Sequence, residues 1–76
     1  MTIRTLDTRG LRFPEPVLQV VVKAGQMKPG EILQVWGDSQ DFEENLRYWC
    51  EKAEKLILSV ESKGESTKMI QIQLRI

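Results

Sequence analysis

The sequence predicts a two-layer α+β sandwich, with two helices on one face of a four-stranded sheet. Turn-forming residues divide the chain into six segments in the order β-α-β-α-β-β. Near the C-terminus, apolar and polar residues alternate in the run Ile70-Gln71-Ile72-Gln73-Leu74-Arg75-Ile76. This alternation is typical of a strand with one buried and one solvated face. Because the polar face is unsuited to a third layer, both helices should cover the same side of the sheet.

The first strand and helix are marked by β-branched residues and by proline and glycine. The segment Ile3–Leu6 predicts a strand. Pro14 and Pro16 suit the first turn of a helix, where a missing N–H costs little. The apolar run Val17–Ala24 follows, and Gly25 is the expected C-terminal cap. The valines would also suit a strand, but proline before the run and glycine after it favour a helix.

A second strand and a second helix follow the turn at Lys28-Pro29-Gly30. The strand is expected over Ile32–Trp36, and Gly37-Asp38-Ser39 interrupts it. Apolar residues then recur at helical spacing: Phe42, Leu46, Trp49, Cys50 and Ala53. This is the clearest periodicity in the chain, and it predicts an amphipathic helix with one apolar face.

Four acidic residues surround the start of this second helix: Asp38, Asp41, Glu43 and Glu44. Asp41 and Glu44 have capping-box spacing, although Asp38 or Ser39 could cap instead. Carboxylates could also hold a hard cation. The helix dipole alone favours acidic residues at this place, so capping is the preferred interpretation and no metal site is predicted.

Two strands should close the sheet as a hairpin. The run Leu56-Ile57-Leu58-Ser59-Val60-Glu61 alternates and predicts a strand. Lys63-Gly64-Glu65 then forms a connection of moderate length. The alternating run at residues 70–76 is the last strand.

Composition narrows the classes of function. The chain has 76 residues, so we expect a single domain over residues 1–76. With one cysteine and no histidine, a disulfide scaffold, histidine-based catalysis and the common zinc sites are excluded, and no cofactor is expected. Eleven basic residues balance eleven acidic ones, which argues against nucleic acid as a partner. No stretch resembles a signal peptide or a membrane span, so the expected location is cytoplasmic, without a membrane partner.

Three groups of side chains could carry chemistry or binding. Cys50 lies on the apolar helix face, where a free cysteine is commonly a buried and inert hydrophobe. Arg9 and Arg12 precede the first helix and form a candidate anion site, although Pro14 and Pro16 remove two N–H donors there. Trp36 could anchor a partner on the uncovered sheet face or could belong to the core.

The run Leu6-Asp7-Thr8-Arg9-Gly10-Leu11-Arg12-Phe13-Pro14-Glu15-Pro16 resembles the signature of the TusA/SirA/YedF family of small sulfur-carrier-like proteins. The turn Met27–Glu31 and the segment from Asp38 through Leu46 to Cys50 are also similar. The resemblance covers nearly the whole chain. It implies a βαβαββ fold, with two helices on a four-stranded mixed sheet.

The resemblance also implies a chemistry. In that family the cysteine before the first proline carries a persulfide, taken from a cysteine desulfurase or a rhodanese-type donor and passed to another protein. Phe13 stands at this position here, and a phenyl ring holds no sulfur. Three further regions depart from the family pattern, at Ser39, at Gln40 and at Glu54-Lys55.

The preferred hypothesis is therefore a TusA-like binding or regulatory member of a sulfur relay, without enzymatic activity of its own. Its partner would be another protein of sulfur metabolism, contacted through Arg12, Phe13, Pro14, Glu15 and Pro16. The sequence defines no oligomeric state. Two alternatives are a sulfur carrier that uses Cys50 and an RNA-binding module, the latter by analogy of fold alone.

Overall fold

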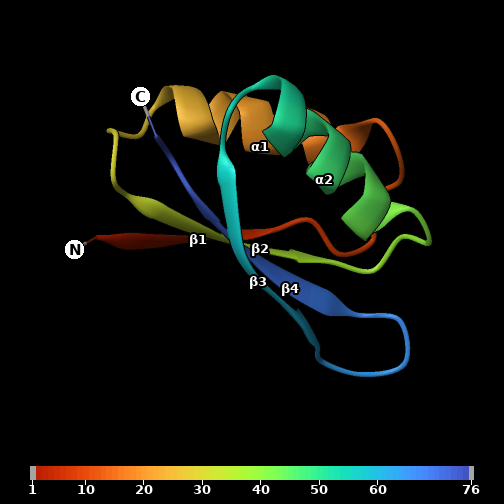
Figure 1. The fold of residues 1–76 in the computed structure, drawn as a ribbon. Helices are drawn as coiled ribbons and strands as arrows, with labels where there is room; N and C mark the ends of the chain where they lie inside the picture. Colours follow the sequence, from red (N-terminus) through yellow and green to blue (C-terminus); the bar gives the residue numbers. More distant parts are fainter. Residues whose placement is uncertain (1, 76) are drawn as a thin grey trace.

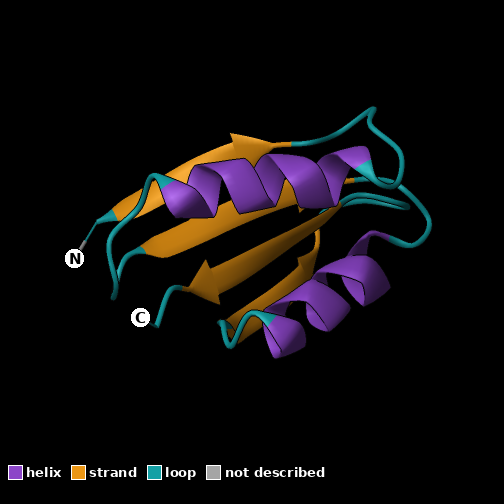
Figure 2. Cartoon of the chain, turned by 90° about the horizontal axis from the view of Figure 1, so that it is seen from above, coloured by secondary structure: helices purple, strands orange, loops and turns teal. Residues whose placement is uncertain are grey.

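The computed structural model describes residues 2–75 and contains four strands and two helices. In chain order these are β1 (Ile3–Asp7), α1 (Glu15–Gly25), β2 (Ile32–Gly37), α2 (Phe42–Lys52), β3 (Leu56–Ser62) and β4 (Lys68–Gln73). The sheet order is β1-β2-β4-β3. Both helices lie on one face of the sheet, and the other face is uncovered (Figures 1 and 2). The predicted element order and two-layer architecture are confirmed.

The sheet is mixed, because β1 runs parallel to β2 while β2 and β3 both run antiparallel to β4. The connection through α1 makes the first pair parallel, since a crossover returns the chain to the same end of the sheet. The register places Leu6 beside Val35 and Val35 beside Ile70. These rows of apolar side chains form the layer against which the helices pack.

The core lies between the central strands and the inner faces of the helices. Its fully buried side chains include Leu33, Val35, Ile70 and Ile72 from the sheet. From the helices they are joined by Val20, Phe42, Leu46 and Cys50, each exposed by 2% or less. The apolar face predicted for α2 is therefore the face that packs on the sheet.

The C-terminal end of α1 differs from the expectation. Gly25 is the last helical residue instead of the cap, and Gln26 takes the C-cap position with right-handed backbone angles. The N–H groups of Gln26 and Met27 donate to the Lys23 and Ala24 carbonyl oxygens, at 3.0 and 3.1 Å. Because these short-range bonds use carbonyls of the last turn, no left-handed glycine is needed there.

The start of α2 also differs from the expectation. Asp41 occupies the N-cap position, but neither it nor another side chain makes a capping hydrogen bond. The expected capping box with Glu44 is therefore absent. Asp38 instead accepts a hydrogen bond from the Gly10 N–H at 2.8 Å, and Glu43 pairs with two cations. Within residues 2–75, no three carboxylate or thiol groups are placed to hold a metal ion.

Strand β3 contains a register irregularity that simple alternation did not predict. Its pairing with β4 skips from Ile57 to Ser59, which leaves Leu58 unpaired in a bulge. As a result Ile57 and Val60 pack against the core, whereas Leu56 and Leu58 are each 42% exposed. The last strand was expected over residues 70–76, but β4 runs over Lys68–Gln73, so Leu74 and Arg75 lie beyond its end. Ile76 lies outside the described residues.

Candidate functional site

The segment between β1 and α1 is tied to the end of β2. Thr8 is fully buried, and both its N–H and its hydroxyl donate to the Trp36 carbonyl oxygen, each at 2.7 Å. Gly10 has a left-handed φ of +87°, and its N–H reaches the Asp38 carboxylate. Because β1 and β2 are parallel, their carboxyl ends share one edge of the sheet. These bonds fix Arg12 and Phe13 at that edge.

Phe13 is the most prominent apolar side chain of this loop, with 64% of its surface exposed. It precedes Pro14, which is the N-cap residue of α1, and Pro16 is a buried residue of the first turn of this helix. The Glu15 N–H donates to the Arg12 carbonyl oxygen at 2.9 Å. With two prolines and one occupied N–H, the start of α1 offers few backbone donors to an anion.

Arg9 does not join Arg12 in a shared anion site. Its guanidinium donates two hydrogen bonds to the Asp7 carboxylate, at 2.9 and 2.7 Å, and lies 5.5 Å from the centre of the Trp36 ring. The hydrogen bonds from Arg9 hold the pKa of Asp7 at about 2. Arg9 is therefore occupied by a local ion pair on the solvated surface.

Arg12 instead lines a polar hollow of about 420 Å³ beside the start of α2. Four segments supply its lining: the loop after β1, the loop after β2, the first turn of α2 and the β3–β4 hairpin. The lining residues are Arg12, Asp38, Ser39, Gln40, Glu43, Glu65, Ser66 and Lys68. A smaller hollow of about 150 Å³ involves Gly10, Leu11 and Arg12 together with Asp38 and Ser39.

Among the described residues, Glu43 and Lys68 are the two charged residues of this hollow that form ion pairs. The Lys68 ammonium donates to Glu43 at 2.7 Å, and the Arg47 guanidinium donates to the other Glu43 oxygen at 2.8 Å. These hydrogen bonds, Lys68 first, lower the pKa of Glu43. Within residues 2–75 the Arg12 side chain has no ion-pair partner, so it is the cation that remains for an incoming group.

Trp36 lies on the sheet face that the helices leave uncovered, in register with Asp7 on β1 and Met69 on β4. Lys63 approaches the ring at 5.9 Å, in addition to Arg9. Lys63 forms an ion pair with Glu61, and Arg9 forms one with Asp7. Trp36 is consequently half-buried under a layer of paired charges.

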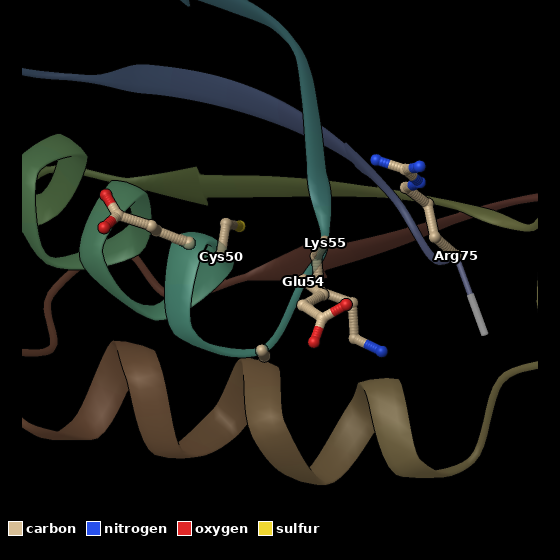
Figure 3. Close-up of a pocket in the computed structure, with 6 residues that line it drawn as sticks. Cys50, Glu54, Lys55 and Arg75 are labelled. Carbon is tan, nitrogen blue, oxygen red and sulfur yellow. The ribbon is translucent and has the colours of Figure 1, made fainter.

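Cys50, the only thiol in the sequence, is 2% exposed. It borders a hollow of about 450 Å³ at the C-terminal end of α2, together with Glu54, Lys55 and Arg75. In Figure 3 the Cys50 sulfur points toward the sheet, whereas the charged ends of Lys55 and Arg75 lie apart from it. Burial raises the pKa of the Cys50 thiol to about 11, although Lys55 and Arg47 oppose this shift. The thiol is therefore protonated at neutral pH.

Comparison with known proteins identifies the family. The model of the family "Sulfurtransferase TusA" matches residues 4–73, which is almost the whole chain. The chain belongs to the TusA family. A "Putative sulfur carrier protein" of Thermotoga maritima is 35% identical over 72 residues, covering 95% of this chain and 91% of the relative.

Two further TusA-family comparisons extend this result. A protein of the same name from Aquifex aeolicus is 31% identical over 64 residues, covering 84% of this chain. The match covers only 32% of that relative, so the chain spans about a third of its length. The crystal structure of a SirA-like protein from Desulfitobacterium hafniense superposes with a TM-score of 0.83, covering 99% of this chain and 100% of the other, at 20% identity. At that identity the likeness establishes the fold.

The sequence located part of this region. The loop with Arg12 and Phe13 was singled out, and the structure places it beside Asp38 and Ser39, 25 or more residues further along the chain. The contribution of the β3–β4 hairpin was missed, including that of Lys68. The antiparallel pairing of Gly37 with Lys68 brings the hairpin to this edge, and no local sequence signal could have revealed it.

Proposed function

We propose that this TusA-family protein docks onto another protein of a sulfur relay without carrying sulfur itself. The observation that carries the proposal is the contrast between Phe13 and Cys50. Phe13, which stands where the resembled signature has its cysteine, is an exposed phenyl ring, and the only thiol in the sequence is 2% exposed with a raised pKa. Sulfur transfer requires a thiolate that a donor can reach, because the thiolate is the nucleophile.

The surface for docking would be the exposed loop and the start of α1. Phe13 offers an apolar contact, and Arg12 offers a cation with no ion-pair partner among residues 2–75. Aromatic and arginine side chains are enriched among residues that dominate binding energy. Thr8 anchors the loop to β2 and Gly10 anchors it to Asp38, so little conformational entropy would be lost on binding.

A sulfur-loading experiment tests the proposal that the protein does not carry sulfur. The native protein is incubated with a cysteine desulfurase and cysteine in reductant-free buffer, and its intact mass is measured. We expect no added sulfur, while a known carrier of the family is labelled in parallel. The Phe13→Cys variant should acquire sulfur if the surrounding loop retains the geometry of a carrier. Added sulfur on the native protein that disappears in Cys50→Ser would establish Cys50 as the carrier and overturn the proposal.

A binding experiment tests the proposal that the protein docks onto a relay partner through Phe13. The affinity for the same desulfurase is measured by titration calorimetry for the native protein, Phe13→Ala and Tyr48→Ala. Tyr48 is the matched control, because it is an aromatic residue on α2 with 66% of its surface exposed, against 64% for Phe13. We expect Phe13→Ala to weaken binding at least tenfold, as for a central aromatic contact, and Tyr48→Ala to change it less than twofold. Equal effects of the two substitutions would rule out the Phe13 contact.

A further inference from the structure

Helix α1 is apolar around most of its circumference. Val20 faces the core and is fully buried. Successive residues of an α-helix are rotated by about 100° around its axis. Leu18 and Val22 lie two residues before and after Val20, so both point roughly 160° away from Val20, toward the opposite side of the helix. They are nevertheless 49% and 62% exposed, and Val21 is 42% exposed. A helix that is apolar on both its inner and its outer side is typical of a helix covered from both sides.

The polar residues of α1 line a single flank. Glu15, Gln19 and Lys23 are spaced by four residues, which places them in a row along the helix. Glu15 and Lys23 are the only charged residues of α1, and within residues 2–75 neither has an ion-pair or hydrogen-bond partner for its side chain. The flank therefore carries an acid at one end, a base at the other and a neutral amide at the centre.

This order of charges is complementary to itself when two helices run antiparallel. Glu15 and Lys23 are each four residues, or about 6 Å, from Gln19. A two-fold axis near Gln19 would place Glu15 of one copy beside Lys23 of the other, twice, and the two Gln19 amides opposite each other. A parallel arrangement would not pair these flanks. The chain has no net charge, so two copies would approach without overall repulsion.

We propose that the outer face of α1 binds a second copy of this chain, as a two-fold symmetric, antiparallel α1–α1 dimer. Leu18, Val21 and Val22 would supply the buried apolar contact, and Glu15 and Lys23 would set the orientation. Surface ion pairs contribute more to specificity than to affinity. An 11-residue helix is about 16 Å long, so the contact lies at the small end of protein interfaces. The dimer is consequently weak and depends on concentration.

Sedimentation equilibrium on the isolated protein tests this proposal, from about 10 µM to about 1 mM, a range suited to a weak complex. We expect a monomer–dimer equilibrium whose dissociation constant rises at least tenfold in Val22→Glu. Leu58→Glu is the matched control, because Leu58 is an exposed apolar residue on β3, away from α1. It should change the constant less than twofold. Circular dichroism of each variant verifies that the fold is intact.

Charge exchange tests the orientation. Glu15→Lys and Lys23→Glu should each weaken dimerisation about threefold or more. In either variant, residues 15 and 23 of the two copies have the same charge, and the two-fold axis brings them together at two places. The double variant E15K/K23E should recover the native constant within about twofold, and an equal mixture of the two single variants should form a mixed dimer. A protein that stays monomeric at about 1 mM, a dimer insensitive to Val22→Glu, or a double variant no better than the singles would overturn the proposal. No relay partner is present in these experiments, so their outcome is independent of the docking function proposed above.

Discussion

Phe42 packs its ring directly over Gly37, at the point where β2 leads toward α2. A Cβ at Gly37 would overlap the ring carbons of Phe42, which is itself 2% exposed. Because a buried ring has little room to move, Gly37→Ala should lower the free energy of unfolding by about 1–3 kcal/mol, the usual range for overpacking. Urea denaturation measures this change.

Gly25→Ala is the control for the Gly37 substitution. Gly25 ends α1, its φ lies outside the left-handed region, and nothing lies within 4 Å of an added Cβ. Alanine has the higher helix propensity, so this change should leave the stability unchanged or raise it by up to about 1 kcal/mol. If the two variants lose similar stability, the close packing of Phe42 on Gly37 is not what makes the glycine necessary.

Cys50 should make stability depend on alkaline pH. Burial raises the pKa of its thiol from 9.0 to about 11, so the folded state holds the proton more tightly than the unfolded state. The stability that the protonated Cys50 thiol contributes is therefore fully present below pH 9, and it is lost as the pH rises toward 11. Urea midpoints measured at intervals across this range should fall more steeply for the native protein than for Cys50→Ala. Parallel curves would show that other titrating groups cause the decline.

At the scale of elements, α2 is held by a few buried side chains on one face. Leu46 is fully buried, and Leu46→Ala should lower the free energy of unfolding by about 2–5 kcal/mol because it leaves a cavity. That is a large share of the roughly 4–11 kcal/mol expected for a chain of this length. Tyr48→Ala, two residues along the same helix and exposed, should cost less than about 0.5 kcal/mol. Thermal and urea unfolding of both variants provide the measurement, and equal losses would contradict the assigned helix face.

The elements also differ in how well periodicity predicted their orientation. Helix α2 and strand β4 follow their apolar patterns, since each buries one face against the other layer. Strand β3 does not, because the bulge at Leu58 shifts Ile57 and Val60 toward the core. An edge strand has a hydrogen-bonding neighbour on one side only, so a bulge there disturbs a single ladder. A regular period of two cannot indicate such an insertion.

At the scale of the whole molecule, the sheet order assembles the candidate site. The parallel pairing of β1 with β2 places the loop with Arg12 and Phe13 beside Asp38, and the antiparallel pairing of β2 with β4 brings Lys68 to the same place. Neither described helix is long and apolar enough to cross a membrane. The same architecture leaves the outer side of α1 and one sheet face uncovered.

The sequence by itself determined the order of elements, the two-layer architecture and the family. These follow from periodicity, turn residues and a local motif, all of which are properties of neighbouring residues. It also pointed to Cys50 as a buried thiol, because the cysteine falls on the apolar face of a helix. The loop with Arg12 and Phe13 was evident for the same reason, since its residues are contiguous.

Only the tertiary structure decided which distant groups meet. Arg9 could have joined Arg12, but its guanidinium lies over the ring of Trp36, which is distant in the sequence. The carboxylates around the start of α2 were expected to cap the helix, but Asp38 accepts a hydrogen bond from the Gly10 N–H and Glu43 accepts one from Lys68. Such choices depend on competition between partners that lie 25 or more residues apart. Strand pairing determines which of these partners are brought together, and the pattern of neighbouring residues does not predict it.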